Sequence, residues 1–179
     1  WGTFGQIDYR DNPLGPRAGG NYTMRFDSYH DRDLARHDFQ RLDMEAQQFI
    51  PLFNKRRVIA LRARTVQTFL TTGQTVPFYQ QSVLGGADDL RGFRPFRFHD
   101  NNLVIANAEY RWEVFSGLDM AIFGDAGRVS RDKWKFGLED LETSVGFGFR
   151  FNVRNAPFLR LDVGFSHEGF QVFMKFNGI

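Results

Sequence analysis

One stretch of the chain, residues 84–93, combines residue types that can restrict a backbone or take part in chemistry. It carries a single cation, Arg91, within a run that is rich in glycine and aspartate. Glycine adopts backbone conformations that are closed to other residues. Three glycines give the stretch this freedom: Gly85, Gly86 and Gly92. The stretch therefore predicts an arginine that lies between conformationally free glycines in a long loop.

A guanidinium group that folds into an enclosed space needs carboxylate partners to offset its desolvation. Glu109 and Asp125 are available, because each lies on the polar face of a following segment with alternating sequence. A bidentate contact between Arg91 and one of these carboxylates would pin the loop. The alternative is a solvated arginine on a mobile surface loop, and composition alone favours this alternative.

Signals for enzymatic or metal chemistry are weaker. His167 stands between Ser166 and Glu168, but neighbours in a strand point to opposite faces. The sequence has no Gly-x-Ser-x-Gly nucleophile elbow and no cysteine, and the pair Asp88-Asp89 is interpreted as solvated loop charge. We therefore expect no enzyme activity, no cofactor and no metal site.

Composition limits the class of protein. Of the 179 residues, 42% are hydrophobic and 16% aromatic, which excludes a disordered chain. The net charge of +2 gives no support to a nucleic-acid partner. No apolar run is long enough for a transmembrane helix, but a membrane barrel has none, because only every second residue of its strands meets lipid.

The elements that must position these groups follow a hydrophobic period of two. The clearest case is 141–153. One face of this segment is apolar apart from one threonine: Leu141, Thr143, Val145, Phe147, Phe149, Phe151 and Val153. The other face is polar or glycine: Glu142, Ser144, Gly146, Gly148, Arg150 and Asn152. Such a strand fits a wall between lipid and a wet lumen.

The same period predicts eight further strands, the first of them the weakest. They are 2–10, 20–29, 39–49, 56–67, 103–115, 117–127, 157–167 and 170–177. Tight turns are expected at 12–16 and 155–157, whereas the loop at 70–100 is long, rich in Gly, Pro and Asp, and without its own periodicity. Short turns at one end and longer loops at the other are typical of outer-membrane barrels.

These features predict an all-β fold, an antiparallel transmembrane β-barrel with eight to nine strands in this chain. Residues 1–179 would form a single barrel domain or the C-terminal segment of one. A soluble β-sandwich or small closed barrel would alternate as well. The uniformly large apolar faces, opposed by charges of both signs, favour the membrane barrel.

Several motifs resemble those of the BamA/TamA superfamily, also called the bacterial surface antigen family. Its lumen loop carries a Gly-Gly stretch and then Arg-Gly-Phe/Tyr, present here as Gly85-Gly86 and Arg91-Gly92-Phe93. The glutamate of Ala108-Glu109-Tyr110 and the aromatic-x-Asp-x-Gly stretch at 123–127 follow in the family's order. Residues 8–19 are similar to the family's Asp-x-Arg-Asn/Asp segment, which ends in Pro-x-x-Gly. The four motifs span most of the chain.

The resemblance implies that Arg91 contacts Glu109 and Asp125, that Phe93 packs beside them, and that this lock is structural and conformational. Family barrels have sixteen strands and usually follow soluble periplasmic repeats. An eight-stranded barrel is just filled by its own side chains and has no room for a long inward loop. We therefore expect half of a sixteen-stranded barrel, completed by missing N-terminal strands or by a second copy in a homodimer.

The resemblance also implies a function. The family inserts or translocates polypeptides, or lipids, through a weak seam between the first and last strands, and 170–177 is the candidate seam strand. The alternative is a passive structural or pore-forming outer-membrane barrel, or a scaffold in a larger membrane complex. Expected partners are outer-membrane lipids and lipopolysaccharide, client polypeptides and other membrane subunits, with no nucleic acid. The expected location is the bacterial outer membrane or that of a derived organelle.

Overall fold

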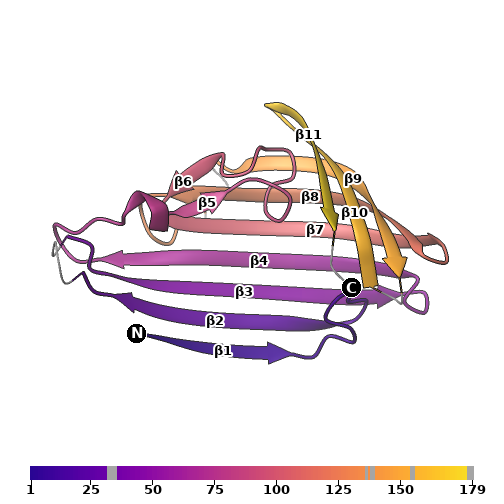
Figure 1. Ribbon diagram of the computed structural model, residues 1–179, viewed down its shortest axis with the longest axis horizontal. Helices are drawn as coiled ribbons and strands as arrows, with labels where there is room; N and C mark the ends of the chain where they lie inside the picture. The colour runs from indigo at the N-terminus through magenta and orange to yellow at the C-terminus, as the bar shows by residue number, and fades with distance from the viewer. Residues whose placement is uncertain (32–35, 136, 138–139, 154–155, 177–179) are drawn as a thin grey trace.

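The computed structural model describes residues 1–31, 36–135, 137, 140–153 and 156–176. Within these residues, nine antiparallel strands form one sheet, in which every strand pairs with the next strand of the main sheet (Figure 1). They are β1 (Gly2–Asp8), β2 (Gly19–Tyr29), β3 (Phe39–Leu52), β4 (Arg57–Leu70), β7 (Asn102–Phe115), β8 (Leu118–Ser130), β9 (Glu142–Val153), β10 (Ala156–Ser166) and β11 (Gly169–Phe176). The predicted all-β antiparallel fold is confirmed, with nine strands, the upper end of the expected range.

Each of the nine strands lies on a segment that the period of two predicted. The reason is visible in β9, where Val145 and Phe147 are exposed on the outer face while Ser144 and Arg150 are buried on the inner face. The sheet curls, so β10 and β11 run steeply across the direction of β1–β4 (Figure 1). We call the face on which the long loop packs the inner face.

Connections differ in length between the two ends of the sheet. At one end β3 and β4 are joined by the turn 53–56, and β7 and β8 by Ser116-Gly117. At the other end lies the connection from β4 to β7, residues 71–101. The turn predicted at 155–157 includes position 155, which lies outside the described residues. The strand predicted at 170–177 ends on position 177, which lies outside them as well.

The long loop is more ordered than the sequence indicated. It contains the 3-10 turn η1 (Phe78–Gln80) and a second sheet of two strands, β5 (Ser82–Leu84) and β6 (Phe98–Asp100). The prediction of a loop without periodicity missed this hairpin because each strand is only three residues long. The hairpin sets the two ends of segment 85–97 side by side (Figure 1).

The outer face presents a broad apolar surface. Large side chains are exposed there on most strands: Met24, Leu61, Ile122, Val145, Phe147, Phe165, Val172 and Met174. Contiguous apolar surface of this kind marks contact with a membrane or a partner. In the part of the chain that the structure describes, no helix is long and apolar enough to cross a membrane.

The sheet has two edges. In the described residues β1 pairs only with β2, and β11 pairs only with β10. Unpaired backbone groups of an edge strand are costly in lipid, so an edge strand in a membrane needs a further strand partner. The completion of the wall, by missing N-terminal strands or by a second copy, stays a prediction, as does its number of strands.

Candidate functional site

Arg91 lies at the inner face, where one side of its guanidinium group makes a bidentate ion pair with Asp125 of β8. Its Nε donates to Asp125 Oδ2 at 2.9 Å and its Nη2 donates to Asp125 Oδ1 at 2.7 Å. The backbone N–H of Arg91 also donates to Oδ2, at 3.1 Å. Two wall residues add donors to the same carboxylate, Asn107 at 2.9 Å and Ser144 at 3.3 Å. Five donors therefore fix the position of this carboxylate and of the loop on it.

Glu109 of β7 holds the other side of Arg91. Its Oε2 accepts from Nη1 of Arg91 and, at 3.0 Å, from Nη2 of Arg150. Its Oε1 accepts from Nε of Arg111 at 2.7 Å. Arg150 in turn donates to Asp162 at 2.6 Å, and Asp162 also pairs with Arg160. The loop arginine thus enters a continuous ionic network that joins β7, β8, β9 and β10.

The network is buried. The side chain of Arg91 is 4% exposed and that of Asp125 is fully covered. Burial by itself lowers the pKa of Arg91, but the hydrogen bonds and charges of Asp125 and Glu109 outweigh it and raise the pKa above its ordinary value. The guanidinium group also lies over the ring of Phe123, 3.4 Å from its centroid. Arg91 is therefore a permanent cation held on three sides.

Gly92 brings the loop backbone against the wall. A Cβ atom at this position would meet Ser144 Cβ at 2.6 Å and the carbonyl oxygen of Phe165 at 2.8 Å. The carbonyl of Gly92 accepts a hydrogen bond from Ser166 Oγ at 2.8 Å. A β-carbon on the facing Gly164 would in turn collide with the carbonyl of Arg91. Glycine is required at both positions because of space.

The other two glycines of the motif act through conformation. Gly85 and Gly86 have φ angles of 115° and 105°, which side chains rarely adopt. They turn the chain out of β5, and this turn closes with a hydrogen bond from the N–H of Gly86 to the carbonyl of Leu90. The tip of the loop, which meets the wall, is Arg91-Gly92-Phe93. These positive φ angles use the backbone freedom that the sequence indicated for the two glycines.

Phe93 anchors the loop through an apolar cluster rather than through the ion pairs. Its side chain is completely buried and makes edge contacts with the rings of Phe98 and His167, at centroid distances of 5.2 and 5.4 Å. The cluster joins three loop residues to the inner face: Val66, Leu84, Leu90, Phe93, Leu103 and Ile105. The side chains of Val66, Leu103 and Ile105 mark where the loop docks on the inner face.

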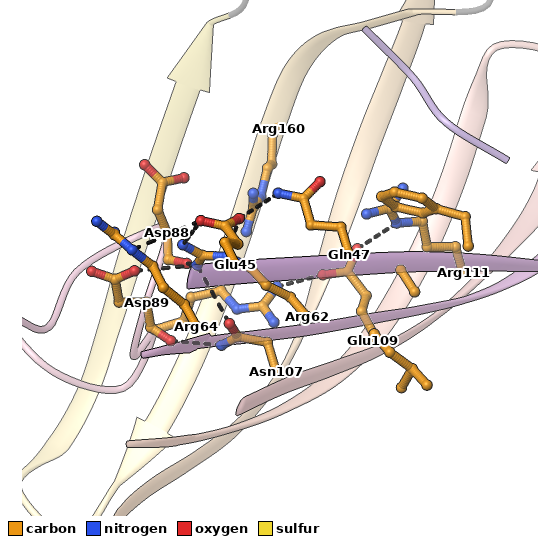
Figure 2. A pocket seen from close by; sticks show the side chains of 14 residues that line it. Glu45, Gln47, Arg62, Arg64, Asp88, Asp89, Asn107, Glu109, Arg111 and Arg160 are labelled. Atoms are coloured by element: carbon orange, nitrogen blue, oxygen red, sulfur yellow. Dashed lines mark hydrogen bonds and ion pairs between the residues drawn. The ribbon is translucent and has the colours of Figure 1, made fainter. Parts of the chain in front are cut away.

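The two aspartates before Arg91 form a second set of contacts, at a cavity of about 550 Å³ between the loop and β3, β4 and β7 (Figure 2). Arg62 Nη1 donates to Asp89 at 3.2 Å and to the carbonyl of Asp88 at 2.6 Å, while its Nε reaches Glu45 at 2.9 Å. Lys175 on β11 pairs with Asp88 at 2.9 Å. Burial raises the pKa of Asp89. These charges are paired, in contrast to the solvated loop charges that the sequence indicated.

The upstream motif at residues 8–19 organises the turn between β1 and β2. Asp11 accepts from the backbone N–H groups of Arg17 and Ala18 and from Lys55. Burial by itself raises the pKa of Asp11, but these hydrogen bonds outweigh burial and lower the pKa to about 2. The turn directs Arg17 at Asp119 of β8, where Nη2 lies 2.9 and 2.7 Å from the two oxygens. The motif therefore ties this turn to the wall that also holds Arg91.

Every residue of the predicted lock is thus brought to one place, together with residues that sequence reasoning missed: Phe123, Arg150, Asp162 and Arg111. His167 contacts Phe93, and Ser166 donates a hydrogen bond to the carbonyl of Gly92 in the loop. Among the described residues, no group of three or more His, Cys, Asp or Glu side chains could hold a metal ion. The arrangement can hold the long loop in place on the inner face of the sheet.

Comparisons with known proteins agree with this geometry. The model of the Omp85 superfamily domain matches residues 5–174. The structure is similar to the crystal structure of BamA from Haemophilus ducreyi lacking POTRA domains 1–3, with a TM-score of 0.81 and 19% identity. The likeness covers 96% of this chain and 41% of that chain, so this chain spans less than half of it. No curated protein matched. The chain belongs to the Omp85 superfamily, and it is an outer-membrane β-barrel protein whose fold is like that of BamA.

Proposed function

We propose that this chain is the C-terminal barrel part of a protein that inserts or translocates polypeptides, or lipids, at the outer membrane. The observation that supports the proposal is the buried lock of Arg91 with Glu109 and Asp125. A barrel that only lines a pore does not need a 31-residue connection held at its inner face by buried ion pairs.

The chemistry of the lock supports a conformational role. Apolar packing of similar volume often stabilises a protein as well as a buried ion pair does, because charges lose hydration on burial. Breaking such a pair by removing one partner is nevertheless strongly destabilising. A network with these properties keeps the loop in one defined position while the seam strand β11 exchanges strand partners.

We further propose that the chain has no catalytic activity. A general base must be able to accept a proton at working pH. The inner-face carboxylates Glu109, Asp125 and Asp162 instead each accept hydrogen bonds from at least one guanidinium group. The partners proposed for this barrel are lipids and lipopolysaccharide at the apolar outer face and unfolded client polypeptides at the seam strand β11.

The experiment uses the protein at its full natural length, reconstituted into liposomes of outer-membrane lipids. The rate at which a denatured outer-membrane polypeptide becomes folded and protease-resistant is measured with and without the protein. We expect the wild type to accelerate folding, and Arg91→Ala to lose most of this acceleration. Arg97→Ala is the matched control, because Arg97 lies in the same loop but makes an exposed ion pair with Glu168.

Ion conductance of the same liposomes separates the two candidate functions. A wild-type protein that conducts ions but does not accelerate folding of any client would be a passive pore, and the proposal would be wrong. Equal acceleration by wild type and Arg91→Ala would be consistent with an insertion function but would show that the lock of Arg91 is not needed for it.

A further inference from the structure

A second, smaller cavity of about 160 Å³ lies near the turn between β1 and β2 and is unusually rich in arginine. Its polar lining consists of four arginines, one carboxylate and one amide: Arg17, Arg111, Arg150, Arg160, Asp119 and Asn152. The only carboxylate, Asp119, is already held by two hydrogen bonds from Arg17. The volume is several times the roughly 30 Å³ that one water molecule occupies in the liquid.

The ionic network behind this cavity contains one more cation than carboxylates. Its four guanidinium groups belong to Arg91, Arg111, Arg150 and Arg160, and its three carboxylates to Glu109, Asp125 and Asp162. Arg91 and Arg150 each contact two of the carboxylates, whereas Arg111 and Arg160 contact one each. The excess positive charge therefore lies at Arg111 and Arg160, at the border of the cavity.

These two side chains also have donors to spare. Arg111 donates through Nε to Glu109, and Arg160 donates through Nε to Asp162 and through Nη2 to the carbonyl of Ala87. Among the described residues, Nη1 and Nη2 of Arg111 and Nη1 of Arg160 have no hydrogen-bond partner. Both arginines border the larger cavity as well, where Figure 2 shows them projecting from β7 and β10. They remain partly exposed, at 26% and 23%.

We propose that this cavity binds one phosphate group between Arg111 and Arg160. Guanidinium groups present several N–H donors in a fixed fork that matches phosphate oxygens. Arg111 and Arg160 come from different strands, β7 and β10, so their spare donors approach from two directions, which suits a tetrahedral oxyanion. The bound phosphate neutralises the excess charge of the network. It also contacts the loop indirectly, because Arg160 holds the carbonyl of Ala87 at 3.2 Å.

The test is a titration of the full-length protein in detergent with inorganic phosphate, followed by calorimetry at constant ionic strength. We expect saturable binding at one site, and Arg111→Gln and Arg160→Gln should each weaken it about tenfold or more, the value of one charged hydrogen bond. Arg64→Gln is the matched control, because Arg64 borders the larger cavity and is paired with Asp43 at 2.8 Å. It should bind phosphate as the wild type does.

Further ligands identify the chemistry and the source. Acetate should compete poorly, and equal binding of acetate would overturn the assignment to phosphate. A soluble short-chain phosphatidylglycerol that binds more tightly than inorganic phosphate would indicate a lipid headgroup, and weaker binding would indicate the free ion. Both outcomes support the site.

Absence of saturable phosphate binding by the folded wild type would overturn the proposal. It would also be overturned if Arg111→Gln and Arg160→Gln both bound phosphate as tightly as the wild type does. If the variants fail to fold, the wild type still gives an answer, because a ligand that binds only the folded state raises the urea midpoint. Phosphate should raise that midpoint relative to chloride at equal ionic strength, at concentrations too low for the general stabilising effect of kosmotropic salts. Binding requires only the folded barrel, so its failure is separate from failure of the insertion assay.

Discussion

The tip and the two flanks of the long loop use the same chemistry in different surroundings. At the tip, Arg91 is 4% exposed and meets two carboxylates. On the flanks, the ion pairs Arg97–Glu168 and Asp88–Lys175 keep nearly half of each basic side chain exposed, at 47% and 45%. Water screens the flanking pairs, so they contribute little to stability, whereas removal of one partner at the tip leaves an unmatched buried charge. The comparison indicates that position within the loop decides what an ion pair does.

The largest effect is expected from breaking the tip. Arg91→Ala leaves Glu109 and Asp125 buried with fewer donors, so it should lower the free energy of unfolding by about 3–5 kcal/mol. Urea unfolding of the barrel, followed by its heat-modifiable mobility on gels, measures this. Asp125→Ala should cost a similar amount, and the double variant should lose much less than the sum, because the residues share one interaction. Additive losses would show that the two residues act independently.

Phenylalanines in the same loop provide the next comparison. Phe93 is fully buried in the apolar cluster, whereas Phe96 is 67% exposed. Phe93→Ala should destabilise the barrel by about 3–5 kcal/mol through loss of apolar burial and creation of a cavity. Phe96→Ala in the same urea experiment should leave the midpoint unchanged. Equal midpoints for the two variants would mean that the loop does not dock on the inner face in the membrane.

Two glycines allow a test of space alone. Gly92→Ala places a methyl group 2.6 Å from Ser144 Cβ and 2.8 Å from the carbonyl oxygen of Phe165. Gly124 is the control, because a β-carbon there would meet nothing within 4 Å. Neither Gly92 nor Gly124 has a positive φ angle. Overpacking at Gly92 should cost about 1–3 kcal/mol, while Gly124→Ala should be nearly neutral. A neutral Gly92→Ala in urea unfolding would show that the tip can withdraw from β9 and β10 without loss.

The strands were predictable from sequence because a wall between two different environments enforces strict alternation. In β9 every second residue faces outward, and the inward residues are small or polar. The hairpin of β5 and β6 was not predictable, because three residues are too few to show a period. The backbone freedom that Gly85 and Gly86 provide was expected, whereas the need for glycine at position 92 arises from a contact with distant strands.

The partners of Arg91 were identified from motif order and face, but the rest of the network was not. Arg150 was placed on the polar face of its strand, yet its contacts with Glu109 and Asp162 depend on register and curl of the sheet. One signal was available in the sequence. Leu103 and Ile105 interrupt the polar face of β7, and both are buried by the loop. Apolar residues on an otherwise polar face indicate a docking site for another part of the chain.

The smallest predicted effect concerns the flank at Asp88 and its dependence on pH. Burial raises the pKa of Asp88, but the hydrogen bond and charge of Lys175 outweigh it and lower the pKa. Because the folded-state pKa lies below the unfolded value, the pair stabilises fully above the ordinary aspartate range, and this contribution is lost as the pH falls through the folded pKa. Asp88→Asn should therefore cost at most about 1 kcal/mol at neutral pH, and nothing once Asp88 is protonated in both states. Urea midpoints of wild type and variant across acidic pH check this, with Lys175→Gln as the partner variant. A difference that grows as the pH falls would show that Asp88 is stabilised by something other than Lys175, and the tip and flank would then no longer differ in kind.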